Sequence, residues 1–313
     1  MSVKVFIDGS SGTTGLRIAD RLAQRPEIEL LSISAEGRKD VNERAKVINS
    51  ADLAFLCLPD AASKEVMPLL RSDVKVLDTS TAFRTDAAWD YGFPELAGQK
   101  EKIQKSYRVA VPGCYASGFI SIARPLVELG LAPAEYPFSC TGISGYSGGG
   151  KKMIAEYESA DRPTHSKLDA PKSYGLGLAH KHLPEMQKIS GLAHTPMFVP
   201  VVCDYYCGMQ VLVPLDLTLA GSTAEQVAEG IAAYYKDAAT VKVHALNEAL
   251  PENGLYSNAM AGTDRMELYM TVNAAGDQMM LVSVFDNLGK GSSGAAVQCM
   301  NLMLGLEETE GLE

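Results

Sequence analysis

One cysteine of the chain stands where a thiolate would be stabilised. Cys114 lies in the sequence Pro-Gly-Cys-Tyr-Ala-Ser-Gly at 112–118, after a predicted strand at 107–111 and before an apolar helix. The amides and the dipole at a helix N-terminus favour anions, and the thiolate is the nucleophilic form of cysteine. We therefore predict that Cys114 is a catalytic nucleophile and not a packing residue. Apolar runs surround the other five cysteines: Cys57, Cys140, Cys203, Cys207 and Cys299.

A cysteine nucleophile needs an acid/base partner, and histidine is the usual one. Two of the five histidines, His180 and His182, stand in Ala-His-Lys-His-Leu-Pro-Glu at 179–185. Pro184 is typical of the first turn of a helix, and Glu185 follows it. This cluster indicates a catalytic site, with a solvated turn as the alternative. The residues alone favour neither histidine over the other.

Glycines three residues apart suggest a nucleotide site near the N-terminus. Gly9, Gly12 and Gly15 follow a predicted strand at 3–8 and open a predicted helix at 13–24. Glycine allows a sharp turn and lets a pyrophosphate approach the amides of a helix N-terminus. A tight turn without a ligand is the alternative. The turn adds hydroxyl groups within reach of phosphate oxygens: Ser10, Ser11, Thr13 and Thr14.

The residues after the second predicted strand bear on the choice of cofactor. An NAD site usually has an acidic residue there to hold the ribose 2′-OH. This chain has Ser34 and Arg38, which suit the 2′-phosphate of NADP, although Glu36 is also compatible with NAD. We predict NADP.

Two further segments are candidate anion sites. Arg84 closes the sequence Asp-Thr-Ser-Thr-Ala-Phe-Arg at 78–84, which leaves the carboxyl end of a predicted strand and suits bidentate binding of a carboxylate or phosphate. The segment 144–151 reads Ser-Gly-Tyr-Ser-Gly-Gly-Gly-Lys, in which Ser147, Gly148 and Lys151 offer a hydroxyl, an amide and a cation. A flexible loop is the alternative for this second segment.

The elements that must position these residues fall into two parts. Up to residue 113, strands and helices alternate, which predicts a Rossmann-like, doubly wound parallel sheet. The predicted strands of this part span 3–8, 28–34, 53–58, 74–79 and 107–111, with helices at 13–24 and 61–70.

From residue 114 the predicted strands follow one another more closely, which indicates an α+β unit with a mixed sheet. They span 138–143, 197–202, 209–219, 241–246, 265–273 and 278–285. We expect a nucleotide-binding domain at 1–113, a catalytic and oligomerisation domain at 114–288, and a final helix within 289–313 that packs back on the first domain.

Composition narrows the class of protein. The net charge of −10 and pI of about 5.1 make nucleic acid and anionic membranes poor partners. No apolar run approaches the roughly 18 residues that a membrane span needs. Cys203 and Cys207 are four apart, but no second pair completes a zinc set, so we expect no metal site. We expect a cytoplasmic protein with free thiols.

Taken together, these segments resemble the N-acetyl-gamma-glutamyl-phosphate reductases of the semialdehyde dehydrogenase superfamily, in their shorter form. The resemblance covers nearly the whole chain and ends in Asn-Leu-Gly-Lys-Gly-Ser-Ser-Gly-Ala-Ala at 287–296. Its more specific segments are those around Cys114 and at 180–185. The chain departs from the family pattern at Val111, where members often carry Asn, and at Met197, where the longer form often has His.

The resemblance implies NADPH-dependent reduction of N-acetyl-γ-glutamyl phosphate to N-acetylglutamate semialdehyde in arginine biosynthesis, through a thioester on Cys114. It also implies that His182 or His180 is the acid/base group and that the protein is a homodimer or homotetramer. The substrate site then includes the candidates named above: Arg84, Ser147, Gly148, Lys151 and Glu185.

Three alternatives remain at this point. The closest is a related semialdehyde dehydrogenase that acts on aspartyl phosphate or an aminoadipyl analogue. The second is a nucleotide-dependent reductase or epimerase in which Cys114 only packs, and which would therefore tolerate alkylation of its thiols. The third is a non-catalytic NADP-binding regulator, against which the cysteine and the two histidines both argue.

Overall fold

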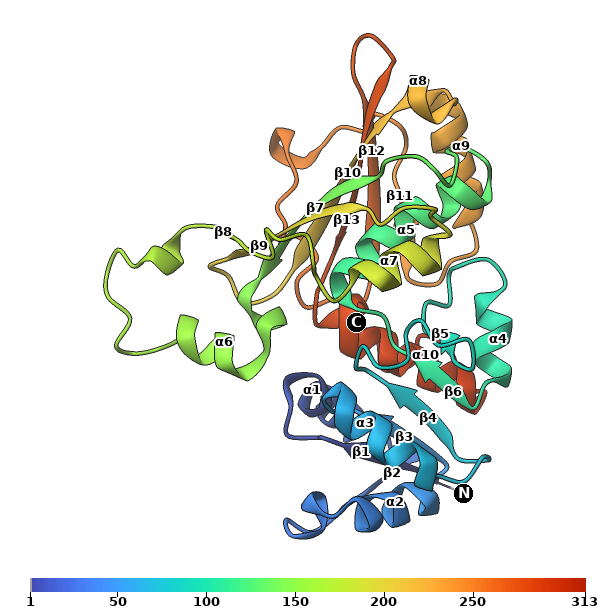
Figure 1. The fold of residues 1–313 in the computed structure, drawn as a ribbon, viewed down its shortest axis with the longest axis vertical. Coiled ribbons are helices and arrows are strands. Elements are labelled where there is room, and N and C mark those ends of the chain that lie inside the picture. Colours follow the sequence, from blue (N-terminus) through green and yellow to red (C-terminus); the bar gives the residue numbers. More distant parts are fainter. Residues whose placement is uncertain (1) are drawn as a thin grey trace. The chain divides into compact units, whose positions relative to one another are not determined.

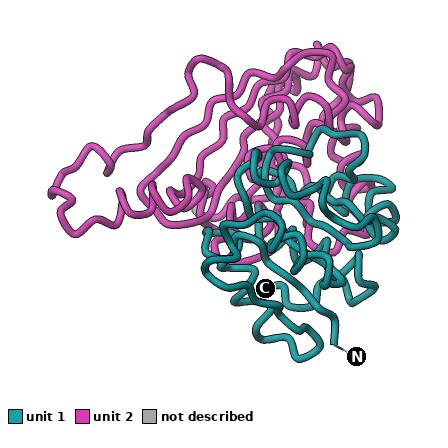
Figure 2. Tube along the Cα trace, turned by 60° about the horizontal axis from the view of Figure 1, so that its bottom comes forward, with its two compact units in different colours: residues 1–113, 292–312 teal, residues 114–291, 313 magenta. Residues whose placement is uncertain are grey.

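The computed structural model describes residues 2–313, which form two compact units (Figure 2). The first unit contains the chain up to Gly113 together with residues 292–312. The second contains residues 114–291 and the last residue, 313. Among the described residues, no helix is long and apolar enough to cross a membrane.

The first unit is built on a sheet of six parallel strands in the order β2-β1-β3-β4-β6-β5 (Figure 1). Its central strands β1, β3 and β4 are apolar and buried, as expected of strands covered on both faces. The strands are β1 (Val3–Asp8), β2 (Ile28–Leu31), β3 (Leu53–Leu56), β4 (Lys75–Asp78), β5 (Asp90–Tyr91) and β6 (Arg108–Ala110).

Helices cover both faces of this sheet, which confirms the predicted doubly wound fold. Apolar residues of α1 (Thr13–Leu22), α4 (Gln99–Lys105) and α10 (Gly294–Leu304) share one core cluster with the sheet. On the other face, α2 (Val41–Ser50) and α3 (Asp60–Val66) contribute to a second cluster. After β2 the chain changes sides of β1, so the switch point of the sheet lies between β1 and β3.

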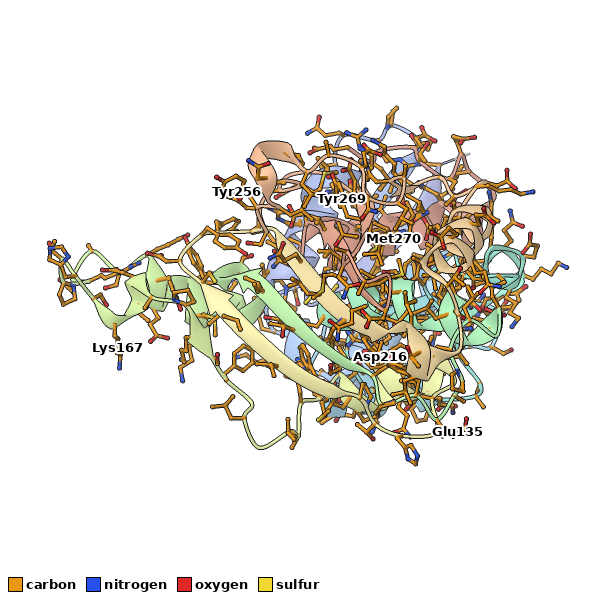
Figure 3. The ribbon with its side chains drawn as sticks, turned by 90° about the horizontal axis from the view of Figure 1, so that it is seen from above. Glu135, Lys167, Asp216, Tyr256, Tyr269 and Met270 are labelled. Carbon is orange, nitrogen blue, oxygen red and sulfur yellow. The ribbon has the colours of Figure 1, made fainter. Side chains whose placement is uncertain are left out.

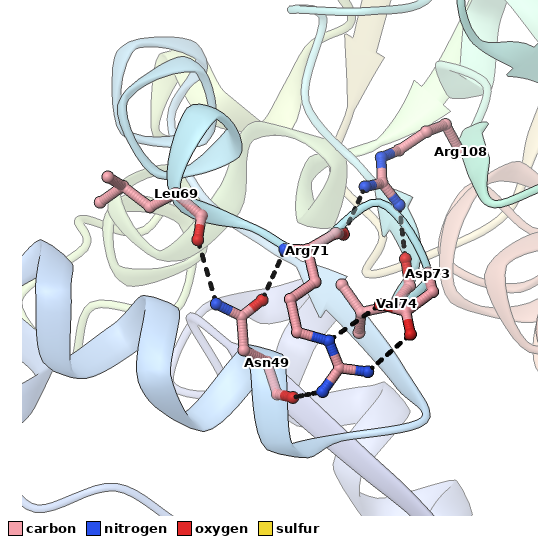
Figure 4. Close-up of polar contacts among 6 residues, drawn as sticks. All are labelled: Asn49, Leu69, Arg71, Asp73, Val74 and Arg108. Carbon is pink, nitrogen blue, oxygen red and sulfur yellow. Dashed lines mark hydrogen bonds and ion pairs between the residues drawn. The ribbon is translucent and has the colours of Figure 1, made fainter.

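Polar contacts close the amino-terminal edge of this sheet (Figure 4). The Asn49 side chain accepts from the Arg71 amide at 2.8 Å and donates to the Leu69 carbonyl at 3.0 Å. Arg71 donates to both carboxylate oxygens of Asp73 at 2.8 and 2.9 Å, and Arg108 donates to the Arg71 carbonyl at 3.0 Å. The β3–β4 connection is therefore fixed at the edge opposite the carboxyl ends of the strands.

The second unit is a mixed sheet of seven strands in the order β11-β12-β13-β10-β7-β9-β8. Its strands are β7 (Ser139–Gly145), β8 (Lys172–Ser173), β9 (Met197–Cys203), β10 (Met209–Asp216), β11 (Val241–Val243), β12 (Met266–Val272) and β13 (Gln278–Phe285). One face packs against α5 (Cys114–Glu128), where Gly118 brings the helix close: a Cβ there would lie 2.5 Å from Val211 of β10. The predicted α+β character of this unit is thus confirmed.

An arm, residues 146–174, extends from the sheet between β7 and β9, with Lys167 near its tip (Figure 3). Its segment η3 (Tyr146–Gly149) leads into α6 (Gly150–Tyr157). Arg162 holds the far part of the arm through two contacts to the carboxylate of Asp204 and one to that of Asp169. A small cluster centred on Tyr157, Leu168 and Val202 gives the arm a core of its own.

The sequence prediction missed several helices. Helix α6 was not predicted; it starts directly from the glycines of the segment 144–151 and packs Tyr157 inward. The strand predicted at 209–219 ends at Asp216, whose side chain caps the short helix α8 (Leu217–Ala220) by accepting from the Leu219 amide. Helices α2, α4 and α9 (Ala224–Tyr234) were not predicted.

Candidate active site

The glycine turn joins β1 to α1 beside the switch point of the first unit. Gly9 has a φ of +88°, and a Cβ there would lie 2.3 Å from the Cys57 carbonyl oxygen. A Cβ on Gly15 would lie 2.5 Å from the Gly9 carbonyl oxygen. At Gly12, by contrast, the nearest atom to a Cβ is 3.4 Å away, so the protein's own packing does not require glycine there. An open approach to the backbone at Gly12 is what a pyrophosphate needs.

A cavity of about 320 Å³ opens at the same carboxyl edge of the sheet. Several of the predicted cofactor residues line it, together with Asp8, Ile33 and Leu58: Gly9, Ser10, Ser11 and Arg38. Its volume lies within the range of ligand pockets. Arg38 is exposed and makes no ion pair with any residue of 2–313, so its guanidinium is available to an anion. These features fit a phosphorylated dinucleotide.

The remaining cofactor candidates lie around the turn but do not line this cavity. Thr13 begins α1, and the hydroxyl of Thr14 lies 3.1 Å from that of Ser292. Ser34 accepts a hydrogen bond from the Gly37 amide at 3.0 Å, so its hydroxyl shapes the turn that carries Arg38.

Cys114 is the first residue of α5 and is partly exposed. The Cys114 side chain packs closely against Gly291, in the segment before α10: a Cβ on Gly291 would lie 3.0 Å from the Cys114 Cβ. Because Cys114 is the first residue of α5, its thiol lies at the positive end of the helix dipole, which favours the thiolate form.

Tyr115 ties the start of this helix to the sheet. A Cβ on Gly142 of β7 would lie 2.4 Å from the Tyr115 ring, so a glycine is required for the ring to lie against the strand. The Tyr115 hydroxyl donates to the Val201 carbonyl at 3.3 Å and accepts from the Tyr174 hydroxyl at 3.3 Å. Burial raises the pKa of both tyrosines, so both hydroxyls are neutral at physiological pH.

The two predicted histidines lie together beside Tyr115. Their ring centroids are 4.7 Å apart, and those of His180 and His182 lie 5.9 and 6.2 Å from the Tyr115 ring. His182 is buried, with 5% of its surface exposed, and immediately precedes α7 (Leu183–Ser190). Burial, with a smaller effect of the Lys181 charge, lowers the pKa of His180 to about 4. Cys114 and both histidines thus belong to one unit, and the histidine rings lie beside Tyr115, the residue that follows the cysteine.

Backbone hydrogen bonds tie the start of the glycine-rich segment before α6 to the β9–β10 turn. The amides of Gly145, Tyr146 and Ser147 donate to the carbonyls of Gly208, Tyr205 and Tyr206, so these three amides do not form an anion cradle. Ser147 is buried and its hydroxyl accepts from Asn287 at 3.0 Å, whereas Gly148 and Lys151 are exposed.

The last two predicted substrate residues have buried side chains. Arg84 donates to the Val111 carbonyl at 2.9 Å and to the Thr79 carbonyl at 3.0 Å, which links the loop after β4 to the end of β6. These contacts favour a structural role over the predicted substrate clamp. Glu185 is 2% exposed and lies in the first turn of α7.

Sequence reasoning gave no role to several residues that organise the site. Tyr174 lies at the end of the arm, and its hydroxyl donates a hydrogen bond to that of Tyr115, 59 positions away in the sequence. Asn287 accepts from the Gly208 amide at 2.8 Å while it donates to Ser147, which joins the β9–β10 turn to the glycine-rich segment. No local pattern marks such long-range pairs. Lys290 is also buried, and it lies in the segment 287–296 that is part of the family resemblance.

Comparison with known proteins gives matches over nearly the whole chain. Residues 4–106 match the family described as "Semialdehyde dehydrogenase, NAD binding domain", and residues 114–287 match "Semialdehyde dehydrogenase, dimerisation domain". N-acetyl-gamma-glutamyl-phosphate reductase of Trichormus variabilis is 46% identical, with 99% of each chain covered. The protein of the same name from Burkholderia cenocepacia is also 46% identical, with 96% of this chain and 97% of the relative covered.

Solved structures of similar fold come from aspartate semialdehyde dehydrogenases. The enzyme II of Vibrio cholerae superposes with a TM-score of 0.68 at 17% identity, over 97% of this chain and 99% of that one. The enzyme of Francisella tularensis gives a TM-score of 0.71 at 14% identity, over 96% and 100% of the two chains. At such identities the likeness concerns the fold alone.

Proposed function

Because this chain belongs to the N-acetyl-gamma-glutamyl-phosphate reductase family, within the semialdehyde dehydrogenases, we propose that it catalyses the NADPH-dependent reduction of N-acetyl-γ-glutamyl phosphate. The products are N-acetylglutamate 5-semialdehyde, NADP and phosphate, as arginine biosynthesis requires. The observation that carries this proposal is the 46% identity to reductases of that name over 99% of both chains. Matching chemistry comes from Cys114 at the start of α5 and from two histidines that lie beside Tyr115, the next residue.

Cys114 is the nucleophile in this proposal. Its thiolate attacks the acyl carbon, a C–S bond forms, the C–O bond to the phosphoryl group breaks, and phosphate leaves with the electron pair. The resulting thioester is a better hydride acceptor than the parent carboxylate. Support comes from the thiol's place at the first residue of a 15-residue helix, where developing negative charge is stabilised.

NADP is the proposed cofactor, and when bound as NADPH it supplies the hydride that reduces the thioester. Within the first unit, the backbone at Gly12 suits the pyrophosphate, and Arg38 suits the 2′-phosphate. Ser10 and Ser11 line the same cavity and offer further hydrogen bonds to phosphate oxygens.

We assign the acid/base role to His182. It donates a hydrogen bond to the oxygen that becomes negative as the thioester is reduced, and this charge returns to the sulfur when the C–S bond breaks and the aldehyde forms. The low pKa of His180, about 4, leaves that imidazole neutral at physiological pH. An imidazole that is neutral at physiological pH is a poor proton donor, so His180 suits this role less well than His182.

The substrate's anionic end requires cations and hydrogen-bond donors within the second unit. Lys151 is exposed at the start of α6, and Gly148 is exposed next to the buried Ser147. We retain these three as substrate residues, with Glu185 as a support of the helix that follows His182. Arg84 supports the loop after β4 through its two carbonyl contacts.

We further propose a homodimer or homotetramer that assembles through the second unit and works in the cytoplasm. The family match at 114–287 is to a dimerisation domain. On the sheet face opposite α5, a row of side chains crosses five strands: Tyr269, Val282, Leu212, Thr141 and Val199. The six cysteines, all within residues 2–313, form no disulfide, as is usual in a reducing compartment.

The reverse reaction tests the proposal. NADP reduction is measured with N-acetylglutamate semialdehyde and phosphate, before and after treatment with iodoacetamide. We expect phosphate-dependent NADPH formation that disappears once Cys114 is alkylated. Burial raises the pKa of Cys57 to about 12 and also raises that of Cys140, so these thiols are expected to react far more slowly. Turnover with aspartate semialdehyde in place of the N-acetyl substrate would assign the alternative semialdehyde dehydrogenase activity instead.

A further inference from the structure

We propose that His180 is a positioning residue for His182, and that it acts by accepting a hydrogen bond from the His182 backbone amide at its Nδ1 atom. This inference rests on the proposed function only in taking His182 as the acid/base group. It assigns different work to the two histidines, which the sequence leaves equivalent.

The contact that carries this assignment is local. The His182 amide donates to His180 Nδ1 at 3.2 Å, while the Leu183 amide donates to the His180 carbonyl at 3.0 Å. The first contact joins residues i and i+2, the pattern in which Asp and Asn side chains form Asx turns. The imidazole therefore closes a turn directly before α7, and that turn fixes the backbone from which the His182 side chain projects.

An aromatic box holds the His180 ring in place. Its centroid lies 5.1 Å from that of Phe198, 5.9 Å from Tyr115 and 6.0 Å from Tyr174. Phe198 and Tyr115 meet the imidazole at interplanar angles of 87° and 90°, as edge-to-face pairs. These rings come from β9, from α5 and from the segment after β8, so three elements restrict the imidazole.

The surroundings also keep the imidazole in the form that the contact needs. Only a neutral imidazole can accept a hydrogen bond, because the protonated ring carries two N–H donors and no acceptor. The rings of His182, Tyr115, Tyr174 and Phe198 face His180, and Lys181 is the charge that acts on its imidazole. Burial and the Lys181 charge lower the pKa of His180 to about 4, which is consistent with this geometry.

Two substitutions at His180 distinguish its role as a hydrogen-bond acceptor from the packing of its ring. His180→Asn keeps an acceptor, because its Oδ1 can take the same i to i+2 contact. His180→Phe keeps an aromatic ring in the box but has no acceptor. We expect H180N to keep kcat within about threefold of wild type, and H180F to lose about 100-fold, since small displacements of a catalytic group have costs of this size.

Amide hydrogen exchange at residue 182 provides a readout that does not depend on the substrate. We expect this amide to be protected in wild type and in H180N, and to exchange at least tenfold faster in H180F. Thermal unfolding and NADPH binding by the first unit check that each variant is folded. If wild type failed to turn over the proposed substrate, the exchange result would still show whether the His180 acceptor fixes the turn at residue 182.

Three results would overturn the assignment. If H180F kept full kcat and slow exchange of the residue 182 amide while H180N lost both, only packing of the ring would matter. Equal losses in both variants, with loss of the pH dependence of kcat that His182→Asn also removes, would make His180 itself the acid/base group. Wild-type behaviour in both variants, for exchange and for kcat, would leave His180 without a role.

Discussion

Burial and helix position give the same residue type different chemistry in this chain. Cys57 and Cys140 are thiols whose pKa burial raises, whereas Cys114 lies partly exposed at a helix N-terminus. The two histidines likewise differ: His182 is buried directly before α7, whereas His180 is partly exposed and accepts a hydrogen bond from the His182 amide. Arg38 and Arg84 form a similar pair: the first is exposed at a cavity, and the second is buried on backbone carbonyls.

The choice of cofactor is testable at Arg38. We expect Arg38→Ala to raise the KM for NADPH about 10- to 50-fold, because a charge-assisted contact to the 2′-phosphate is lost. The KM for NADH should change less than threefold, since NADH has no such phosphate. Steady-state kinetics with both cofactors measures this contrast, and Arg71→Ala, far from the cavity, is the matched control. An equal loss for both cofactors would contradict the assigned contact.

Among the elements, the β1–α1 turn shows two different reasons for glycine. Gly9 has a positive φ and a carbonyl 2.3 Å from any Cβ, so the fold requires glycine there. Gly12 has room for a Cβ within the protein, so its glycine is better explained by a ligand. Both glycines belong to the same evenly spaced pattern in the sequence, and only the structure shows that the reasons for them differ.

Two alanine substitutions test this difference. Gly12→Ala should change the free energy of unfolding by less than about 1 kcal/mol, as expected at a helix N-cap, and weaken NADPH binding at least tenfold. Gly9→Ala should lower the free energy of unfolding by about 2 kcal/mol or more, because a left-handed residue and a backbone clash are both involved. Thermal unfolding and NADPH fluorescence titration measure the two effects. Unchanged NADPH affinity in Gly12→Ala would argue against a pyrophosphate at this turn.

The strongly periodic elements were predictable, and the irregular ones were not. Buried strands such as β3 read directly as apolar runs bounded by turn residues. Helix α9 was missed although Thr223 and Gln226 form a capping box, a signal that the sequence does carry. The Tyr174–Tyr115 and Asn287–Ser147 contacts were unpredictable, because each joins residues that are distant in sequence.

For the whole molecule, the face of the second sheet opposite α5 is the surface that we propose for assembly. Side chains on this face remain exposed, Met197 by 55%, Val199 by 37% and Met280 by 36%. Loop residues Leu250 and Leu255 line a cavity against this face together with Tyr269, which Figure 3 labels. Large exposed apolar patches usually mark a protein interface.

A charged residue on this face should prevent assembly. We expect Val199→Lys and Met280→Glu to shift the protein from oligomer to monomer, because each variant buries an unpaired charge in the interface. Light scattering after size-exclusion chromatography measures the mass, and Leu69→Lys, at an exposed leucine of the first unit, is the control. An oligomer that persists in both variants would mean that the interface lies on another surface.

The acyl-enzyme itself is the most direct test of the account, which assigns the chemistry to a thioester on Cys114. The protein is mixed with N-acetyl-γ-glutamyl phosphate without a nicotinamide cofactor and examined by intact-protein and peptide mass spectrometry. We predict one N-acetylglutamyl group per chain on the peptide that contains Cys114, removed by hydroxylamine and absent in Cys114→Ala. Turnover by Cys114→Ala, or acylation at another residue in the wild type, would contradict the account.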